Sequence, residues 1–136
     1  MNGRTPTKIA IVGGGGAVGA SAAYALMISG LASEIVLVDV NERRAEGEAM
    51  DLMQGAPFVR PVTVRHGGYP DCADSQIVVI TAGAAQRPGE TRLDLVKKNT
   101  AILRDMIPQI AQAAPNAILT ASPRRAWSLS LSRQSH

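Results

Sequence analysis

Apolar and polar positions follow two alternating patterns along the chain. Short apolar runs rich in β-branched residues predict buried strands at 8–12, 34–40, 62–67 and 77–83, with a fifth strand that opens at 116–119. Longer stretches carry apolar residues at helical spacing and predict helices at 17–30, 41–57 and 91–115. Strands that are apolar on both faces and alternate with helices predict an α/β fold of the Rossmann type, with a doubly wound parallel sheet.

The ends of the predicted helices carry recognisable signals. Gly30 is a candidate C-cap for the first helix, and Asn41 is a candidate N-cap for the second. Gly55 and Pro57 are expected to stop that second helix. Pro108 lies inside the third, and we expect it to kink or divide the helix because proline has no N–H to donate.

Composition bounds the size and class of the protein. A chain of 136 residues is long enough for one domain with a real core and too short for two. Hydrophobic residues make up 46% and charged residues 18%, which is typical of a globular protein. Because aromatic residues are only 3%, the core is expected to be aliphatic.

The positive net charge comes from the end of the chain. Of the 14 Lys and Arg residues, three are Arg124, Arg125 and Arg133, so the remaining 11 balance the 11 Asp and Glu. A neutral body with a basic tail does not present the basic surface that binds a nucleic-acid duplex. We therefore expect no nucleic-acid partner.

Neither disulfide chemistry nor a membrane segment is expected. Cys72 is the only cysteine, and without an adjacent base it is interpreted as an inert, half-buried thiol. No apolar run reaches the roughly 18 residues that a transmembrane helix needs, and the first residues are polar rather than signal-like. A soluble, cytoplasmic protein is the expectation, with no metal site.

A glycine-rich loop joins the first predicted strand to the first predicted helix. Only one register fits G-x-G-x-x-G, with Gly14 for the tight turn, Gly16 for approach to a pyrophosphate and Gly19 for close helix–strand packing. Asp39 lies 20 residues beyond Gly19, at the end of the second strand, where a carboxylate can accept both ribose hydroxyls of an adenosine. The pattern favours NAD over NADP, since Asp39 would repel a 2′-phosphate. A flexible turn plus a capping aspartate is the alternative.

The loop after the fourth predicted strand is the most specific stretch of the sequence. It reads ITAGAAQRPGETRLDLVKKN and resembles the lactate/malate dehydrogenase family, and within it the lactate dehydrogenases. KIAIVGGGGAVG, EIVLVDVNE, AEGEAMDLMQGAPF and GGYPDCADSQIVVITAG are similar to that family in the same order, over residues 8–119. The resemblance implies NAD-dependent L-lactate dehydrogenase chemistry, hydride transfer between NADH and pyruvate in glycolysis, and a full-length parent that is a homo-oligomer, a tetramer.

The resemblance also implies roles for single residues. Arg92 would be the lid arginine that polarises the substrate carbonyl, a task that suits an always-charged guanidinium. Gln86 falls where substrates are discriminated: an arginine there would pair with the second carboxylate of malate, so a neutral amide favours pyruvate or lactate. Both could otherwise be solvated loop residues. Further cofactor contacts carry over to Val18, Arg44, Tyr69, Gly83 and Ala84, whereas the Met50/Met53 pair is expected to fill the core.

One departure from the family lies in the glycine loop. The family runs from strand to motif as V-G-x-G-x-x-G, and here Gly13 is an additional residue between Val12 and Gly14. A bulge at the strand end could absorb it. The insertion could instead move the loop and weaken NAD binding.

The end of the sequence departs from the family altogether. The family supplies a proton from a histidine that is held by an aspartate. The only histidines here are His66 and His136, and neither stands at the position of that catalytic histidine. TASPRRAWSLSLSRQSH stands where a T-N-P-V-D-like segment is expected, and we interpret it as translation in a shifted reading frame, with a genuine short tail as the alternative. The sequence thus predicts a truncated NAD-binding Rossmann domain of about five strands over 1–121, no substrate domain, and a basic, Ser-rich tail over 122–136.

The expected function is the cofactor-binding portion of an L-lactate dehydrogenase, catalytically inactive or nearly so by itself. A non-catalytic NAD-binding module and a malate dehydrogenase of the lactate-like type remain alternatives, the latter disfavoured by Gln86. A nucleotide-sugar epimerase or short-chain reductase would need a Tyr-x-x-x-Lys pair, and neither Tyr24 nor Tyr69 has a lysine four residues on.

Overall fold

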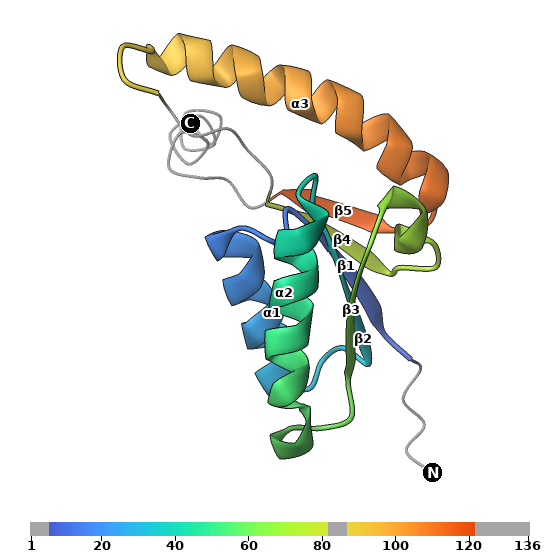
Figure 1. Cartoon of the computed structure of the whole chain (residues 1–136). Coiled ribbons are helices and arrows are strands. Elements are labelled where there is room, and N and C mark those ends of the chain that lie inside the picture. Colours follow the sequence, from blue (N-terminus) through green and yellow to red (C-terminus); the bar gives the residue numbers. More distant parts are fainter. Residues whose placement is uncertain (1–5, 82–86, 122–136) are drawn as a thin grey trace, which may run out of the picture.

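The computed structural model describes residues 6–81 and 87–121. Three helices and five strands make up most of it, together with two short 3₁₀ helices (Figure 1). Their order is β1 Lys8–Val12, α1 Ala17–Ser29, β2 Glu34–Val38, α2 Glu42–Gln54, η1 Ala56–Phe58, β3 Thr63–Gly67, η2 Tyr69–Cys72, β4 Ile77–Ile80, α3 Arg92–Ala113 and β5 Ile118–Ala121.

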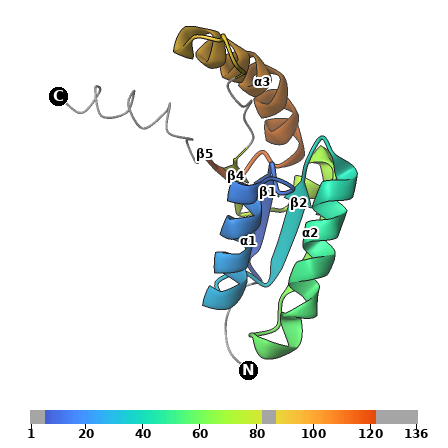
Figure 2. The same cartoon turned by 60° about the vertical axis from the view of Figure 1, so that its left-hand side comes forward.

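The five strands form one parallel sheet in the order β3-β2-β1-β4-β5. Helices α1 and α2 lie side by side on one face of the sheet, and α3 lies on the other (Figures 1 and 2). The predicted Rossmann-type α/β fold is therefore confirmed. Among the described residues no helix is long and apolar enough to cross a membrane.

The core consists of two aliphatic layers because side chains of a strand point alternately to opposite faces. Ile9 and Ile11 pack on the α1–α2 side with Met27, whereas Ala10 and Val12 pack on the α3 side with Ile110. The central strands β1 and β2 are buried on both faces, as the apolar runs predicted. Burial of this kind contributes about 25 cal/mol per Å² of apolar surface and dominates the stability of such a sheet.

Most predicted element ends agree with the structure. Gly30 is the left-handed C-cap of α1, and the Asn41 side chain caps α2 by accepting a hydrogen bond from the Arg44 N–H. The strands β2 and β4 end sooner than expected, and β5 begins two residues later. Of the two outcomes expected at Pro108, a kink or a division of the helix, the division is wrong, because α3 is one helix of 22 residues with Pro108 inside it. The helix curves gently in Figure 1.

Candidate functional site

The site lies at the carboxyl ends of the central strands. The chain moves outward from β1 through β2 to β3, and then returns across β1 to β4 and β5. Between β1 and β4 the connections therefore leave toward opposite faces, which opens a crevice above the sheet where doubly wound folds bind ligands. The glycine loop of residues 13–16 begins at this point, directly after β1.

The glycine loop starts with a bulge. The N–H groups of Gly13 and Gly14 both donate to the Val38 carbonyl, with N···O distances of 2.6 and 3.1 Å. The pairing of β1 with β2 is regular from Lys8 to Val12, so the loop and not the strand takes up the additional residue. Gly13 has a φ of 89°, a left-handed value that disfavours any side chain there.

The structure corrects the role expected for Gly14. The positive φ of the tight turn belongs to Gly13, and Gly14 is required instead by packing, since a Cβ there would lie 2.8 Å from the Leu37 Cβ. Gly19 has its expected role, because a Cβ would lie 2.4 Å from the Gly13 carbonyl oxygen. At Gly16, the N-cap of α1, the nearest atom to a Cβ would be the Gly13 carbonyl oxygen at 3.4 Å, so packing within the described structure does not require a glycine there. Its role beside a pyrophosphate stays a prediction.

Asp39 lies directly beyond β2 and faces the glycine loop. Its Oδ2 accepts a hydrogen bond from the Gly15 N–H at 2.9 Å, and its Oδ1 accepts one from the Asn41 N–H at 3.0 Å. Gly15 also packs against the first turn of α2, where a Cβ would lie 2.8 Å from the Arg44 Cβ. The structure thus brings together the predicted glycines, Asp39 and Arg44, and leaves the Arg44 side chain exposed.

The backbone amides at this point divide into two groups. The Gly16 N–H donates to the Gly13 carbonyl at 3.0 Å, so every N–H group of the loop 13–16 has an acceptor within the protein. Ala17, Val18 and Gly19 form the first turn of α1, where amides have no acceptor within a helix. A first turn of this kind, at the positive end of the helix dipole, suits a pyrophosphate, and Val18 is exposed there.

Thr81 is a site residue that sequence reasoning missed. It follows β4, and both its N–H and its hydroxyl donate to the Val12 carbonyl, at 2.8 and 2.9 Å. Its Oγ1 would also lie 2.9 Å from a Cβ on Gly19. Thr81 therefore holds the ends of β1 and β4 together against α1. The only sequence signal was a hydroxyl residue at the end of an otherwise apolar run.

The 3₁₀ helix η2 contributes Tyr69 and Cys72. Tyr69 is half-buried against the α3 side of the core, and burial, followed by the Asp105 carboxylate, raises the pKa of its phenol. Cys72 is fully buried, beyond the half-burial expected, and this burial raises the pKa of its thiol. A buried, protonated thiol is a poor nucleophile, which agrees with the interpretation of Cys72 as inert.

The interpretation of Met50 as core filler is wrong. Its side chain is 62% exposed on the outer side of α2. Met53 is partly exposed as well, and its sulfur accepts a hydrogen bond from the Val64 N–H at 3.2 Å. Met50 faces away from the buried residues of α2, Ala45, Ala49 and Leu52, whereas Met53 lies toward β3.

Of the two predicted substrate residues the structure describes Arg92, and it does not bring Arg92 to the glycine loop. Arg92 is the first residue of α3, directly after the N-cap Thr91, and its side chain is exposed. This end of α3 stands apart from the sheet in both views (Figures 1 and 2). Gln86, Gly83, Ala84 and His136 lie outside the described residues, and His66 is exposed on β3.

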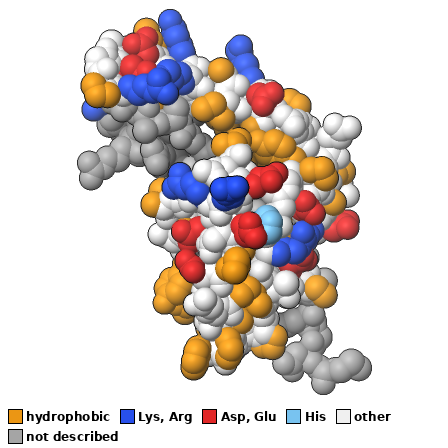
Figure 3. All heavy atoms as spheres, viewed as in Figure 1, with side chains coloured by type: hydrophobic (Ala, Val, Ile, Leu, Met, Phe, Trp, Pro, Cys, Tyr) orange, Lys and Arg blue, Asp and Glu red, His pale blue; other side chains and the backbone are white. Residues whose placement is uncertain are grey.

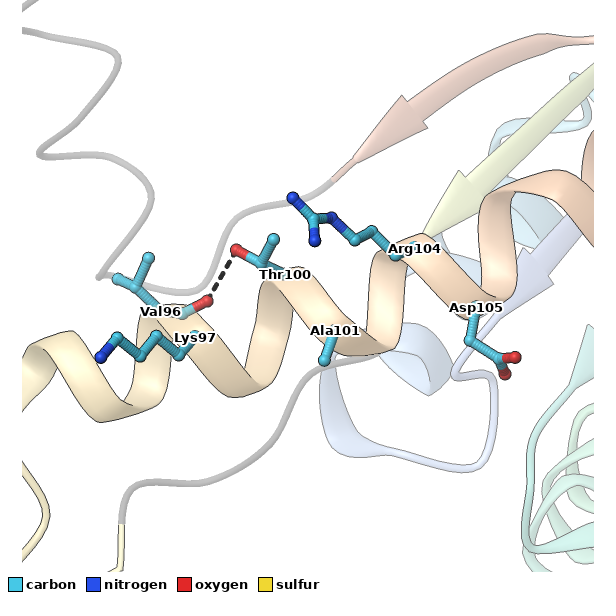
Figure 4. A pocket seen from close by; sticks show the side chains of 6 residues that line it. All are labelled: Val96, Lys97, Thr100, Ala101, Arg104 and Asp105. Carbon is cyan, nitrogen blue, oxygen red and sulfur yellow. Dashed lines mark hydrogen bonds between the residues drawn. The ribbon is translucent and has the colours of Figure 1, made fainter.

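A pocket of about 590 Å³ lies along α3 and involves none of the predicted site residues. Figure 4 shows that its lining side chains come from this one helix, namely Val96, Lys97, Thr100, Ala101, Arg104 and Asp105. Thr100 is turned back to its own helix and donates to the Val96 carbonyl at 2.8 Å. We therefore assign the candidate site to the glycine loop and Asp39.

Known proteins match the chain over the same region. The family described as lactate/malate dehydrogenase, NAD binding domain, matches residues 7–122. L-lactate dehydrogenase 1 of Clostridium acetobutylicum is 58% identical over 113 residues, which are 83% of this chain and 36% of that protein. L-lactate dehydrogenase of Clostridium botulinum strain Hall is 58% identical over 116 residues, 85% of this chain and again 36% of the relative.

Solved structures agree with the sequence relatives. MGS-M5, a lactate dehydrogenase from a Medee basin deep-sea metagenome library, superposes with a TM-score of 0.83 at 40% identity, covering 93% of this chain and 43% of its own. The minor L-lactate dehydrogenase of Enterococcus mundtii superposes with a TM-score of 0.79 at 42% identity, covering 88% and 39%. The chain thus spans about 36% of the length of the curated relatives it matches.

Proposed function

The chain belongs to the lactate/malate dehydrogenase family, as its sequence motifs predicted, and we propose that it is the NAD-binding portion of an L-lactate dehydrogenase. The inherited reaction would be hydride transfer between NADH and pyruvate. The identity of 58% with proteins named L-lactate dehydrogenase supports lactate chemistry over malate chemistry. The family also supports a cytoplasmic enzyme that acts on small molecules and works as a homo-oligomer.

The position of Asp39 is the observation that carries the proposal. Its carboxylate lies at the carboxyl end of β2 and within hydrogen-bond distance of the glycine loop, 2.9 Å from the Gly15 nitrogen. A carboxylate there can accept the ribose hydroxyls of an adenosine whose pyrophosphate is bound by the first turn of α1. Bound NAD would supply the hydride carrier, while these residues hold and orient its adenosine half.

We assign the remaining roles in the same proposal. Gly14, Gly16, Val18 and Gly19 would form the pyrophosphate loop, with Arg44 and Tyr69 at the adenosine end and Gly83 and Ala84 beside the nicotinamide. Gln86 would select the substrate, and Arg92 would polarise its carbonyl. We take the NAD-binding domain to span 1–121, with 122–136 as a separate tail. The match of the NAD-binding domain family to residues 7–122 supports this boundary.

Titration of the purified chain with NADH, followed by the change in nicotinamide fluorescence, tests the proposal. We expect saturable binding, and we expect Asp39→Ala to weaken it by about tenfold or more, because a hydrogen bond to a charged group contributes roughly 1.5–3 kcal/mol. The same substitution should reduce the preference for NADH over NADPH. Asp51→Ala, which removes an exposed carboxylate from α2, is the matched control and should bind like the parent. Equal loss in both variants, or no binding by the parent, would refute the proposal.

A further inference from the structure

The glycine loop contains one residue more than is needed to continue the hydrogen bonds between β1 and β2. Gly13 and Gly14 share the Val38 carbonyl as their acceptor, which leaves one of the two surplus to the pairing of β1 with β2. Gly13 has a left-handed φ of 89° at this point. Two residues later, the middle of the loop lies against the turn between β2 and α2.

Gly15, in the middle of the loop, lies against Asp39. Gly15 is buried, its N–H donates to the Asp39 Oδ2 at 2.9 Å, and a Cβ on it would lie 2.8 Å from the Arg44 Cβ. The Gly16 N–H is likewise engaged, with the Gly13 carbonyl at 3.0 Å. The loop has therefore satisfied its own amides and has covered one oxygen of the carboxylate that would accept the ribose.

We propose that Gly13 sets the dinucleotide affinity of this chain by holding the glycine loop in a closed position. In this position the Gly15 N–H donates its hydrogen bond to the Asp39 Oδ2. That bond uses one acceptor site of the Asp39 Oδ2, and the Gly15 backbone covers that oxygen where the loop packs against Arg44. A ribose that uses both oxygens of the carboxylate therefore requires the loop to move off α2. A protein whose binding-competent state is only partly populated has its apparent affinity lowered by that fraction. The inference rests on the proposed function, since it concerns the same nucleotide site.

Deletion of Gly13 provides the first test. The shortened loop reads V-G-x-G-x-x-G and lacks the length with which Gly15 reaches Asp39. We expect NADH to bind the deletion variant at least about tenfold more tightly than the parent chain, since the competing bond to a charged group is removed. Unchanged or weaker binding by a folded deletion variant would overturn the inference.

A second variant excludes the closed position of the loop by steric contact alone. Gly15→Ala brings a Cβ within 2.8 Å of the Arg44 Cβ and 2.9 Å of the Asp39 Oδ2, so the closed position is no longer accessible. Position 15 is an x of the motif, so the open loop accepts an alanine there, and we expect tighter NADH binding. Gly47→Ala adds the same methyl to α2 where nothing lies within 4 Å, and should bind like the parent.

Circular dichroism and urea unfolding establish which variants are folded. If the deletion variant does not fold, the binding of NADH by Gly15→Ala decides the inference by itself. Support requires tighter binding in every folded loop variant with Gly47→Ala unchanged. Saturable binding by the parent with no gain in the loop variants would overturn the inference and leave the proposed function standing. No NADH binding by any of the proteins would overturn both.

Discussion

Gly19 lies where three backbone segments converge. A Cβ at this position would lie 2.4 Å from the Gly13 oxygen, 2.8 Å from the Gly14 Cα and 2.9 Å from the Thr81 Oγ1. Two of these atoms belong to the backbone of the loop, and the third is fixed by its own bond to the Val12 carbonyl. The absence of a side chain at Gly19 is therefore what lets α1 begin close to both β1 and β4.

We expect Gly19→Ala to lower the free energy of unfolding by about 2 kcal/mol, because added volume in a well-packed site typically costs 1–3 kcal/mol. Urea denaturation of the two proteins measures the difference. Gly47→Ala is the control, since it adds a methyl to an exposed helical position with nothing within 4 Å. That control should gain about 0.5–1 kcal/mol from helix propensity. Equal changes in the two variants would refute the packing argument.

The sequence revealed the parts of this site that depend on spacing. A β–α–β unit fixes where Gly19 and Asp39 must fall, and the structure brings Asp39 to the glycine loop. It could not reveal the bond between Gly15 and Asp39, because that bond depends on where a loop of four glycines places one surplus residue. It also assigned the tight turn to Gly14, whereas the left-handed conformation lies one residue earlier, at Gly13.

At the scale of elements, an arginine on the edge strand β3 connects three segments. Arg65 forms ion pairs with Glu34 of β2 at 2.8 Å and with Asp71 of η2 at 3.2 Å. The Asp71 Oδ2 also accepts a hydrogen bond from the Gly68 N–H at 2.8 Å. This N–H, followed by the Arg65 guanidinium, lowers the pKa of the Asp71 carboxyl. The network therefore fixes η2 against the edge of the sheet.

A lowered pKa in the folded state means that ionised Asp71 stabilises the fold above its unfolded pKa, and that this contribution is lost as the pH falls through the folded pKa. We expect Asp71→Asn to reduce the free energy of unfolding by about 0.5–1 kcal/mol near pH 7, since exposed ion pairs contribute little and the Asp71 side chain is 42% exposed. The difference should shrink below about pH 4, where the unfolded carboxyl is protonated. Urea unfolding at pH 7 and pH 3 tests this, with Asp51→Asn as the control. A difference that persists at pH 3 would contradict it.

The third helix shows what hydrophobic spacing leaves open at this scale. Apolar residues recur along the whole of α3, yet within the part of the chain that the structure describes its fully buried apolar side chains, Met106 and Ile110, both belong to its second half. Leu93 and Val96 in the first half are exposed although they belong to the same pattern. The pattern predicted a helix correctly and could not say how much of its apolar face would find a partner, because that depends on how far the sheet extends beneath it.

At the scale of the whole molecule, α1 has apolar side chains on both of its sides. Its inner side packs on the sheet, whereas Tyr24, Ile28 and the following Leu31 form an exposed stripe, with Ile28 at 56% and Leu31 at 68% exposure. Figure 3 shows apolar side chains gathered toward the lower part of the molecule, where α1 and α2 end. A helix that is apolar all round is normally buried on all sides, so this stripe is a surface that favours association.

We expect the chain to self-associate through this stripe, with an average mass that rises above that of the monomer as the concentration increases. Ile28→Lys places a charge in the middle of the stripe and should keep the protein monomeric over the same range, which sedimentation equilibrium measures. Val40→Lys is the matched control: Val40 is 93% exposed at the turn between β2 and α2, apart from the stripe, and its replacement should leave the association unchanged. In dilute solution, where both proteins are monomeric, the Ile28→Lys variant should unfold at the same urea concentration as the parent, because all three side chains of the stripe are exposed. A parent chain that is monomeric throughout, or a control that dissociates as fully as Ile28→Lys, would show that the apolar stripe on α1 does not drive self-association.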